Sequence, residues 1–476
     1  MTPPQRDDAE RPVAALLAPD ILDLLEEDPS SVALETEEMH PADLADVAEA
    51  LPEDRLVAFL SALPTARAAD VLEYLSEDLR SLALEAMSTR QAAALVTEMT
   101  PDDRADVLEE LEEERAEEIL QEIPAAARAE TEALLQYEPD SAGGRMTTEF
   151  VAAAETLTVE EALRSVRAMA RTERREALYT VYTTDAKGRL LGVLSLRELL
   201  AAPEGAHLSD VAWTEVHTVL PTAPQGDVVR LASDYDLVAV PVVDDDRRLL
   251  GVVTVDDVID AIEEEQTEDV QKLGGMEALD EPYMQIGFLA MLKKRAGWLS
   301  ILMVSEMFTT SALQHYDKEL ERAAVLTLFV PLVMSSGGNS GSQSTSLITR
   351  AMALDEVRLR DWWRVAVREL PSGMTLGAIL GVIAIVRILL WQHFGFYDYT
   401  MQGRTPIGYV AGTIACALVG IVTFGSMTGS MLPFLLRRLG FDPASASAPF
   451  VATLVDVTGL IIYFNVALLF LRGTLL

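Results

Sequence analysis

The amino-acid sequence predicts a multidomain membrane protein: an all-α superhelical N-domain, a duplicated α/β domain and a five-helix transmembrane domain. Three observations predict this fold class. A twelve-residue repeat runs from His40 to about Leu135, and the segment RLLGVLSLREL at 189–199 returns as RLLGVVTVDDV at 248–258. Five long apolar segments then occupy residues 293–476, which we assign to the membrane.

The twelve-residue repeat predicts a small α-solenoid, which we assign to residues 40–137. Its units often open with Pro, Ser or Thr, so each predicts one short capped helix packed on its neighbours. The last position of the unit is apolar throughout: Leu51, Leu63, Leu75, Met87, Met99, Leu111, Ile123 and Leu135. The seventh position carries acids, and the default interpretation is a solvated face: Asp46, Asp70, Asp106 and Glu118. Residues 1–39 open without a secretion signal, and we expect them to form a mobile acidic extension.

Short strands and helices alternate in the next domain, residues 138–262. A connecting helix follows within residues 263–292, and acids crowd into the thirteen residues around its start, among them Asp257, Asp260, Glu264, Glu265, Glu268 and Asp269. Two carboxylates about 4 Å apart repel by about 4 kcal/mol at an effective dielectric near 20. A divalent cation would remove that repulsion, and a solvated acidic linker is the alternative.

The apolar segments lie at about 296–314, 323–349, 371–392, 407–434 and 448–471, each long enough to span a bilayer. Basic residues concentrate on one side of these spans, which predicts a cytoplasmic N-terminus and a C-terminus outside. The ten on that side are Lys293, Lys294, Arg295, Arg350, Arg358, Arg360, Arg364, Arg368, Arg437 and Arg438.

Asp456 lies inside the last apolar segment, where an ionisable group is costly unless it faces water, an ion or a partner. A cation pathway explains it best, and a carboxylate hydrogen-bonded within a helix bundle is the alternative. Glu306 is a second acid of this kind. The second span contains the run SSGGNSGSQ at 335–343, which predicts unwound backbone that lines a wet cavity; close packing of small residues is the alternative. One Asp456 per chain makes a poor pore, so we infer a homodimer with two such acids at its axis.

Charge is divided unequally along the chain. The net charge is −39; residues 291–476 hold 15 Lys and Arg against 11 Asp and Glu, which leaves 22 against 65, or −43, for residues 1–290. Such a surface repels nucleic acid, so no nucleic-acid partner is expected. A single cysteine, Cys416, excludes an internal disulfide and a multi-cysteine metal site.

The two related segments at 189–199 and 248–258 resemble a pair of cystathionine-β-synthase (CBS) modules, which often bind adenine nucleotides. The resemblance implies an α/β tandem CBS domain with possible ATP binding in its cleft, through Arg197, Glu198, Ser233 and Thr254. Glu198 departs from the family pattern, in which Asp is common at this position.

The whole order of parts resembles the MgtE magnesium channel family. The resemblance is carried by YEPDSAGGRM at 137–146, VTVDDVIDAIEEEQTEDVQKLG at 253–274, PLVMSSGGNSGSQS at 331–344 and the long segment at 432–464. It implies a multi-pass protein of a prokaryotic plasma (inner) membrane and no enzyme. The implied pore residues are Asp456, Glu306, Gly337, Gly338, Asn339 and Thr453. The implied regulatory magnesium ligands are Asp70, Asp102, Asp106, Asp236, Asp257, Asp260, Glu265, Glu268 and Asp269.

The function expected from these features is passive Mg²⁺ influx that cytoplasmic Mg²⁺ closes by binding between the N-domain, the CBS domain and the connecting helix. No Walker A pattern for ATP hydrolysis is present in the sequence. Two alternatives remain open: a broader divalent-cation channel that passes Mn²⁺ or Co²⁺, and a CBS-regulated anion channel. A membrane-anchored sensor or enzyme without a pore would need a catalytic motif, and none was found in the sequence.

Overall fold

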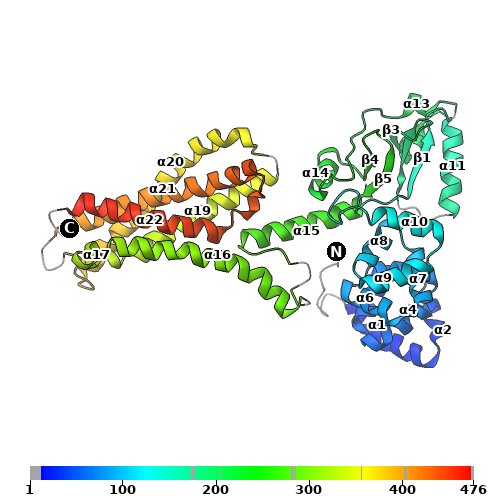
Figure 1. Ribbon diagram of the computed structural model, residues 1–476, viewed down its shortest axis with the longest axis horizontal. Coiled ribbons are helices and arrows are strands. Elements are labelled where there is room, and N and C mark those ends of the chain that lie inside the picture. The colour runs from blue at the N-terminus through cyan, green and yellow to red at the C-terminus, as the bar shows by residue number, and fades with distance from the viewer. Residues whose placement is uncertain are drawn as a thin grey trace. The chain divides into compact units, whose positions relative to one another are not determined.

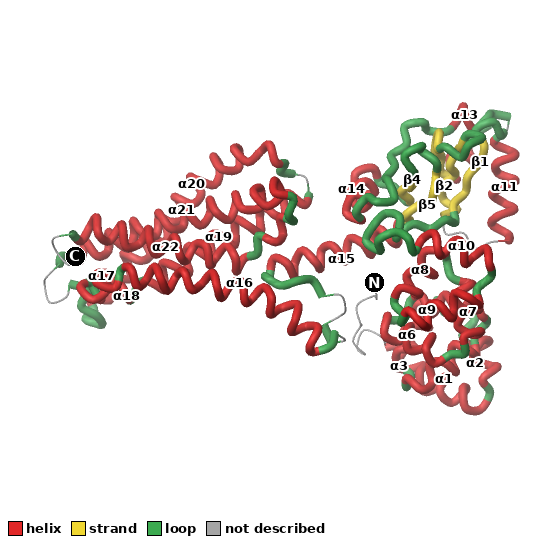
Figure 2. Tube along the Cα trace, viewed as in Figure 1, coloured by secondary structure: helices red, strands yellow, loops and turns green. Residues whose placement is uncertain are grey.

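The computed structural model describes residues 12–172, 177–203, 205–279, 283–284, 286–354, 356–400 and 405–472. The chain divides into two compact units, Met1–Glu265 and Gln266–Leu476. The first holds the short N-terminal helices and the strands, and the second holds the long helices (Figure 1; Figure 2).

Eight helices of nine or ten residues begin twelve residues apart, which confirms the repeat. Pro or Ser commonly stands at or just before the first helical position; Ser88, for example, accepts a hydrogen bond from the Gln91 amide. From Leu51 to Ile123, the apolar position that ends each unit packs in one continuous core with residues such as Leu44, Phe59 and Leu72, whereas Leu135 packs against the core of the next domain. These helices are α3 (Pro41–Ala50), α4 (Glu53–Ala62), α5 (Thr65–Glu73), α6 (Glu77–Ala86), α7 (Thr89–Glu98), α8 (Pro101–Glu109), α9 (Glu113–Glu122) and α10 (Ala125–Leu134).

Two further helices precede the repeat, so the mobile extension that we expected is wrong from Pro12 onward. Helix α1 (Pro12–Glu27) and helix α2 (Pro29–Glu35) pack against α3 and α4. Ala18, Ile21 and Leu25 of α1 are buried in the same core, because their helical spacing gives α1 an apolar face. Residues 1–11 lie outside the described residues.

The α/β part contains the same strand arrangement twice. In the first copy β1 (Phe150–Ala154) pairs parallel with β2 (Ala177–Thr184), which pairs antiparallel with β3 (Leu190–Ser195). In the second, Val219 bridges parallel to β4, which pairs antiparallel with β5. The two copies meet at an antiparallel bridge between Arg189 and Arg248. The other elements are α11 (Val159–Thr172), α12 (Leu196–Ala201), α13 (Leu208–Val211), α14 (Gln225–Tyr235), β4 (Ala239–Val243), β5 (Leu249–Thr254) and α15 (Val255–Leu273).

The end of the helical domain and the second α/β copy share one apolar core. Ala105 of α8 and Leu134 of α10 are buried together with Val228 of α14, Val242 of β4 and Val258 of α15. This core brings the acidic first turn of α8 to the acidic first turn of α15.

The second unit is helical. Four of its described helical segments are long and apolar enough to cross a membrane: Phe288–His315, Leu359–His393, Ile407–Leu439 and Ala448–Leu471. These correspond to four of the five spans that the sequence predicts. The helices are α16 (Phe288–His315), α17 (Asp317–Arg322), α18 (Ala324–Thr327), α19 (Val330–Ala353), α20 (Trp362–His393), α21 (Ile407–Leu439) and α22 (Ala448–Leu471), with short 3₁₀ turns at Leu359–Asp361 and Pro443–Ser445.

Helix α19 is continuous, so the unwound backbone expected at residues 335–343 is wrong. The glycines allow close packing of intact helices instead. A Cβ at Gly341 would lie 2.8 Å from Val451 Cγ1 and 3.2 Å from the Gly425 carbonyl oxygen. Ser340 Oγ and Ser426 Oγ are 2.7 Å apart and hydrogen-bonded. The alternative of small-residue packing therefore describes this segment, because the freed space is filled by α21 and α22.

Candidate cation-binding sites

Asp456 occupies the middle of α22, and its side chain is half-buried. No hydrogen bond or ion pair is recorded for its carboxylate within the described part of the chain. Helix α16 packs against α22 and carries Glu306, whose carboxylate is near enough to repel that of Asp456. Two acids thus approach each other in membrane-spanning helices, an arrangement that favours a cation over an anion.

The other residues predicted for the pore lie on α19 and α22. A Cβ at Gly338 would lie 3.3 Å from the Ala452 Cβ, one turn before Asp456, so Asp456 lies on the side of α22 that faces α19. Asn339 is exposed, whereas Gly337 is buried against Ile421 and Val455. Thr453 is also buried, and its hydroxyl donates to the Pro449 carbonyl at 2.8 Å. Gly337 and Thr453 therefore serve packing, and Asn339 has the accessible oxygen and nitrogen atoms.

A second site lies where α8 meets the start of α15. Asp102 is 5% exposed, and its Oδ1 atom is buried with no hydrogen-bond partner among the described residues. The negative charges of Asp103 and Asp257 both act on it. The charges of Asp103, Asp106 and Asp256 act on Asp257 in turn. Carboxylates from two parts of the chain therefore converge on one small volume.

Burial and mutual repulsion raise the pKa values of this cluster. Burial raises the pKa of Asp102 well above its usual range, and the charges of Asp257 and Asp103 add to the effect. Burial likewise raises the pKa of Asp257 well above its usual range, although Thr254 Oγ1 donates to its Oδ2 at 2.7 Å. Burial also raises the pKa of Asp106, against the opposing charge of Arg145. In the folded protein, a bound proton or cation would therefore stabilise these carboxyl groups.

Arg145 is a basic residue beside this cluster. Its side chain is 14% exposed, and its guanidinium forms an ion pair with Glu264 of α15. It also lies 3.9 Å from Asp140, close to the Asp106 and Asp257 charges. The charge of Arg80 acts on Asp103 and Asp106 as well, but the acids outnumber these two bases and leave a net negative charge at the site.

The remaining predicted ligands of the first unit are spread around the cluster. Burial raises the pKa of Asp260, which lies one turn into α15. The Glu265 carboxylate lies against Gly226 in the first turn of α14. Asp236 ends α14 in a left-handed conformation with φ of 50° and is exposed. Asp70 lies on α5, three helices before α8 in the chain. The structure therefore groups Asp102, Asp106 and Asp257 most closely.

The last part of α15 forms a separate acidic site in the second unit. Lys272 Nζ lies 2.6 Å from Glu268 Oε1 and 2.6 Å from Asp442 Oδ2, which joins the connecting helix to the loop before α22. Burial raises the pKa of Asp269, and the nearby Asp442 charge adds to the effect. Asp442 thus joins the predicted acids Glu268 and Asp269 at this position.

Two of the four residues predicted for nucleotide, Glu198 and Thr254, are engaged within the protein. Glu198 Oε2 accepts from the Ser195 amide at 2.8 Å and its hydroxyl at 2.9 Å, and Glu198 Oε1 accepts from Trp213 Nε1 at 2.9 Å. Thr254 caps α15 through Asp257, while Arg197 and Ser233 are exposed. A ribose would have to compete for Glu198 with these hydrogen bonds, and ATP binding stays a prediction.

Four acids and one base escaped the sequence reasoning. Asp103 and Asp256 stand beside predicted ligands in the doublets of PDDRAD and TVDDV, and the doublets themselves were the signal. Arg145 lies in the quoted segment at 137–146. No sequence pattern marked Asp442 as part of a site, because its partner Lys272 lies 170 residues away in the chain. Glu369 of α20 accepts a hydrogen bond from Ser344 Oγ of α19 at 3.0 Å. It lies two residues before Pro371, where the third predicted span begins, so the sequence offered no reason to assign it a role inside the membrane domain.

The donors at all these positions are oxygens, which suits Mg²⁺. No three Asp, Glu, His or Cys side chains of the described ranges are arranged to coordinate one ion directly. Mg²⁺ usually keeps several waters and uses only one or two carboxylates, so a site of this kind needs no such trio. The orphaned Asp102 oxygen is the observation that fits a cation best.

Three family models match the chain. They are the divalent cation transporter model MgtE at residues 330–466, the MgtE intracellular N domain at 39–140, and the CBS domain at 142–205 and 208–264. The matches confirm the predicted fold class.

Curated relatives and a solved structure are similar as well. The chain is 44% identical over 346 residues to the magnesium transporter MgtE of Thermus thermophilus, covering 73% of each chain. It is 35% identical over 343 residues to the magnesium transporter MgtE of Enterococcus faecalis, covering 72% of each. A crystal structure of the soluble part of a magnesium transporter aligns with 31% identity and a TM-score of 0.50, over 54% of this chain and 99% of that one.

Proposed function

This chain belongs to the MgtE family of divalent cation transporters, and from that premise we propose that it is a magnesium channel. Mg²⁺ passes inward through its membrane helices, and cytoplasmic Mg²⁺ closes the path. The curated relatives named above are magnesium transporters, which supports Mg²⁺ as the transported ion.

The observation that carries the proposal is the unpaired Asp456 carboxylate in the middle of α22. A charge at that depth costs several kcal/mol unless it is compensated. Asp456 and the neighbouring Glu306 would hold a hydrated divalent ion through its water molecules. The membrane potential supplies about 2.3 kcal/mol per charge per 100 mV, and a divalent ion carries two charges. Influx therefore needs no ATP hydrolysis.

We propose that two chains form a C2 dimer around the ion path. A single Asp456 supplies one negative charge, whereas two related by a twofold axis would oppose a divalent ion with equal charge. We also propose that the N-terminal unit is cytoplasmic, because basic residues concentrate at the ends of the spans that lie on that side.

Closure by cytoplasmic Mg²⁺ would act through the acid cluster of α8 and α15. At high Mg²⁺ the carboxylates of Asp102, Asp106 and Asp257 are neutralised, which favours contact of the N-domain with the CBS pair and α15. At low Mg²⁺ their repulsion favours separation. The device is a two-state equilibrium shifted by the ligand, and the buried, unpartnered oxygen of Asp102 supports it.

The test is Mg²⁺ uptake into proteoliposomes at low and at millimolar Mg²⁺ on the cytoplasmic face. Asp456→Ala is expected to lower the flux at least tenfold, whereas Glu356→Gln removes a charge outside the spans and is expected to keep it. Asp102→Asn combined with Asp257→Asn is expected to leave the flux open at millimolar Mg²⁺.

Three results would each contradict a different part of the proposal. Flux that survives Asp456→Ala would remove that residue from the ion path. Wild-type flux that ignores cytoplasmic Mg²⁺ would remove the sensing role of the acid cluster, and chloride flux through the wild type would favour an anion channel instead.

A further inference from the structure

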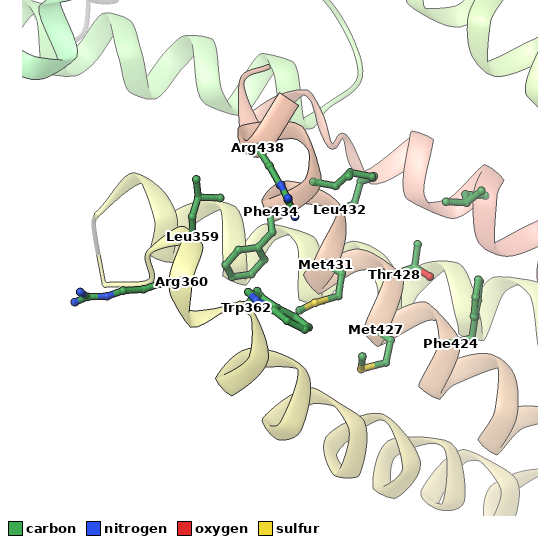
Figure 3. Close-up of a pocket in the computed structure, with 12 residues that line it drawn as sticks. Leu359, Arg360, Trp362, Phe424, Met427, Thr428, Met431, Leu432, Phe434 and Arg438 are labelled. Atoms are coloured by element: carbon green, nitrogen blue, oxygen red, sulfur yellow. The ribbon is translucent and has the colours of Figure 1, made fainter. Parts of the chain in front are cut away.

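A groove of about 920 Å³ lies on the surface of the membrane helices, and Asp456 does not line it. It lies between the start of α20 and one face of α21, with Leu454 of α22 at its side (Figure 3). Apart from Thr428, the side chains along it are apolar except at one end, where Arg360 and Arg438 stand.

The apolar side chains form a stripe along α21. Phe424, Met427, Met431 and Leu435 follow one another at helical spacing, and Arg438 continues the same stripe. From Phe424 to Arg438 the helix rises about 21 Å at 1.5 Å per residue. One half of a ~30 Å hydrocarbon core is about 15 Å thick, so the stripe spans one leaflet and ends in a cation beyond it.

The charged end of the groove has no described partner. Within the described ranges, neither Arg360 nor Arg438 forms a hydrogen bond or an ion pair with the protein. Arg438 reaches toward the apolar side chains, whereas Arg360 extends from the rim away from them (Figure 3). Trp362 is 52% exposed beside them, as is typical of an aromatic residue at the membrane–water boundary.

We propose that this groove binds an anionic phospholipid of the cytoplasmic leaflet. Arg438 would hold the phosphate, Arg360 at the rim would add positive charge near the headgroup, and an acyl chain would lie along the stripe, where Met427 and Met431 can adapt to its shape. A basic pocket between transmembrane helices on the cytoplasmic side is the arrangement expected for such a headgroup. Two unpaired guanidinium groups favour this occupant over the apolar face of a second copy of the chain.

The test is native mass spectrometry of the full-length chain after reconstitution in vesicles of phosphatidylcholine with phosphatidylglycerol at 3:1 and extraction in mild detergent. The wild type is expected to retain phosphatidylglycerol. Arg360→Gln with Arg438→Gln removes about two units of attraction near 1 kcal/mol each, so its apparent affinity is expected to fall about thirtyfold. Met431→Trp fills the groove without changing charge and is expected to weaken binding at least tenfold.

The matched control is Arg364→Gln with Arg368→Gln, which removes the same charge from the same end of α20 outside the groove. It is expected to change the affinity by at most about threefold. The proposal is overturned if both pairs of arginine variants lose phosphatidylglycerol equally, or if Met431→Trp retains it fully. Equal retention of phosphatidylcholine by the wild type would overturn it, and so would cross-linking of Met431→Cys to a second chain.

Discussion

Asp102 shows how a single buried carboxyl can make the stability of this fold depend on pH. Its carboxyl is buried at the first turn of α8 beside the Asp257 carboxyl, with one oxygen unpartnered in the described structure. The folded protein therefore holds a proton on this group to higher pH than an unfolded chain, in which the aspartate pKa is about 3.9. Stability from this source is present below that pKa and is lost as the pH rises through the raised pKa in the folded state.

Asp102→Asn is expected to raise the thermal midpoint of the metal-free protein by a few degrees at pH 8 and by much less at pH 5. The amide carries no charge, which removes a desolvation cost of about 1–3 kcal/mol at the higher pH. The same variant is expected to lose much of the midpoint rise that millimolar Mg²⁺ gives the wild type. Differential scanning fluorimetry of the full-length chain in EDTA and in Mg²⁺ measures both.

Glu132→Gln, on the exposed face of α10, is the matched control for this variant. It is expected to leave both midpoints unchanged. A midpoint of Asp102→Asn that falls at pH 8 in EDTA would mean that the wild-type carboxylate is already compensated, and the argument for a cation there would fail.

At the scale of single elements, α19 depends on glycine for its position. The Cβ that Gly341→Ala adds would lie 2.8 Å from Val451 Cγ1, so α19 must move from α22 or Val451 must change conformation. Such overpacking costs about 1–3 kcal/mol. The thermal midpoint in detergent, followed by size-exclusion chromatography with fluorescence detection, is expected to fall by several degrees.

Gly412→Ala of α21 is the control, because its Cβ would meet only the Phe470 ring at 3.9 Å in the described structure. It is expected to keep or slightly raise the midpoint, since alanine favours a helix over glycine. Equal midpoints for the two variants would show that α19 has room to move.

The elements also show what a sequence can and cannot predict. The helix starts from Pro41 to Ala125 follow from the twelve-residue period, because each unit repeats the same turn and the same buried position. The helical state of 335–343 could not be read from its glycines and serines, since packing on α21 and α22 outweighs their weak helix propensity. Helices α1 and α2 were overlooked because no repeat marks them.

The candidate sites divide in the same way. Asp456 and Asp257 were found from acids in an apolar segment and in a crowded helix start, whereas Asp102 and Asp106 were implied as ligands by the family resemblance alone. The structure places Asp102, Asp106 and Asp257 together. The contributions of Asp103 and Arg145 could not be predicted, because which face of α8 meets α15 depends on the core that joins Ala105 to Val258.

At the scale of the whole molecule, the distribution of basic residues fixes an expected orientation in the membrane. Arg364 lies at the start of α20, on the side of the membrane that holds most of the basic residues. Arg472 directly follows the end of α22, on the other side. In a chain with Cys416→Ser, Arg364→Cys is expected to react with a membrane-impermeant maleimide only after the cells are permeabilised. Arg472→Cys is expected to react in intact cells.

Labelling in both states for both positions, compared by gel shift, decides the orientation. The unmodified Cys416→Ser chain gives the background, because Cys416 is the only cysteine in the sequence. Reaction of Arg364→Cys in intact cells would reverse the orientation and place the acid cluster outside, where it could not sense cytoplasmic Mg²⁺.

The polar composition of α19 also has a consequence for how the protein is synthesised. Among the long described helices of the second unit, α19 is the one that is not apolar enough to be recognised as a membrane span by its composition. Its partners on α21 and α22 arrive late, since Ser426 is 86 residues beyond Ser340 and Ala448 is 106 residues beyond Ser342, whereas Glu369 of α20 follows Ser344 by only 25 residues. At about 5–20 residues per second, a ribosome needs roughly 4–17 s to extend the chain from Ser340 to Ser426. During that interval a nascent α19 must shelter in the translocation machinery or remain outside the bilayer, which makes this stretch the vulnerable step of biogenesis.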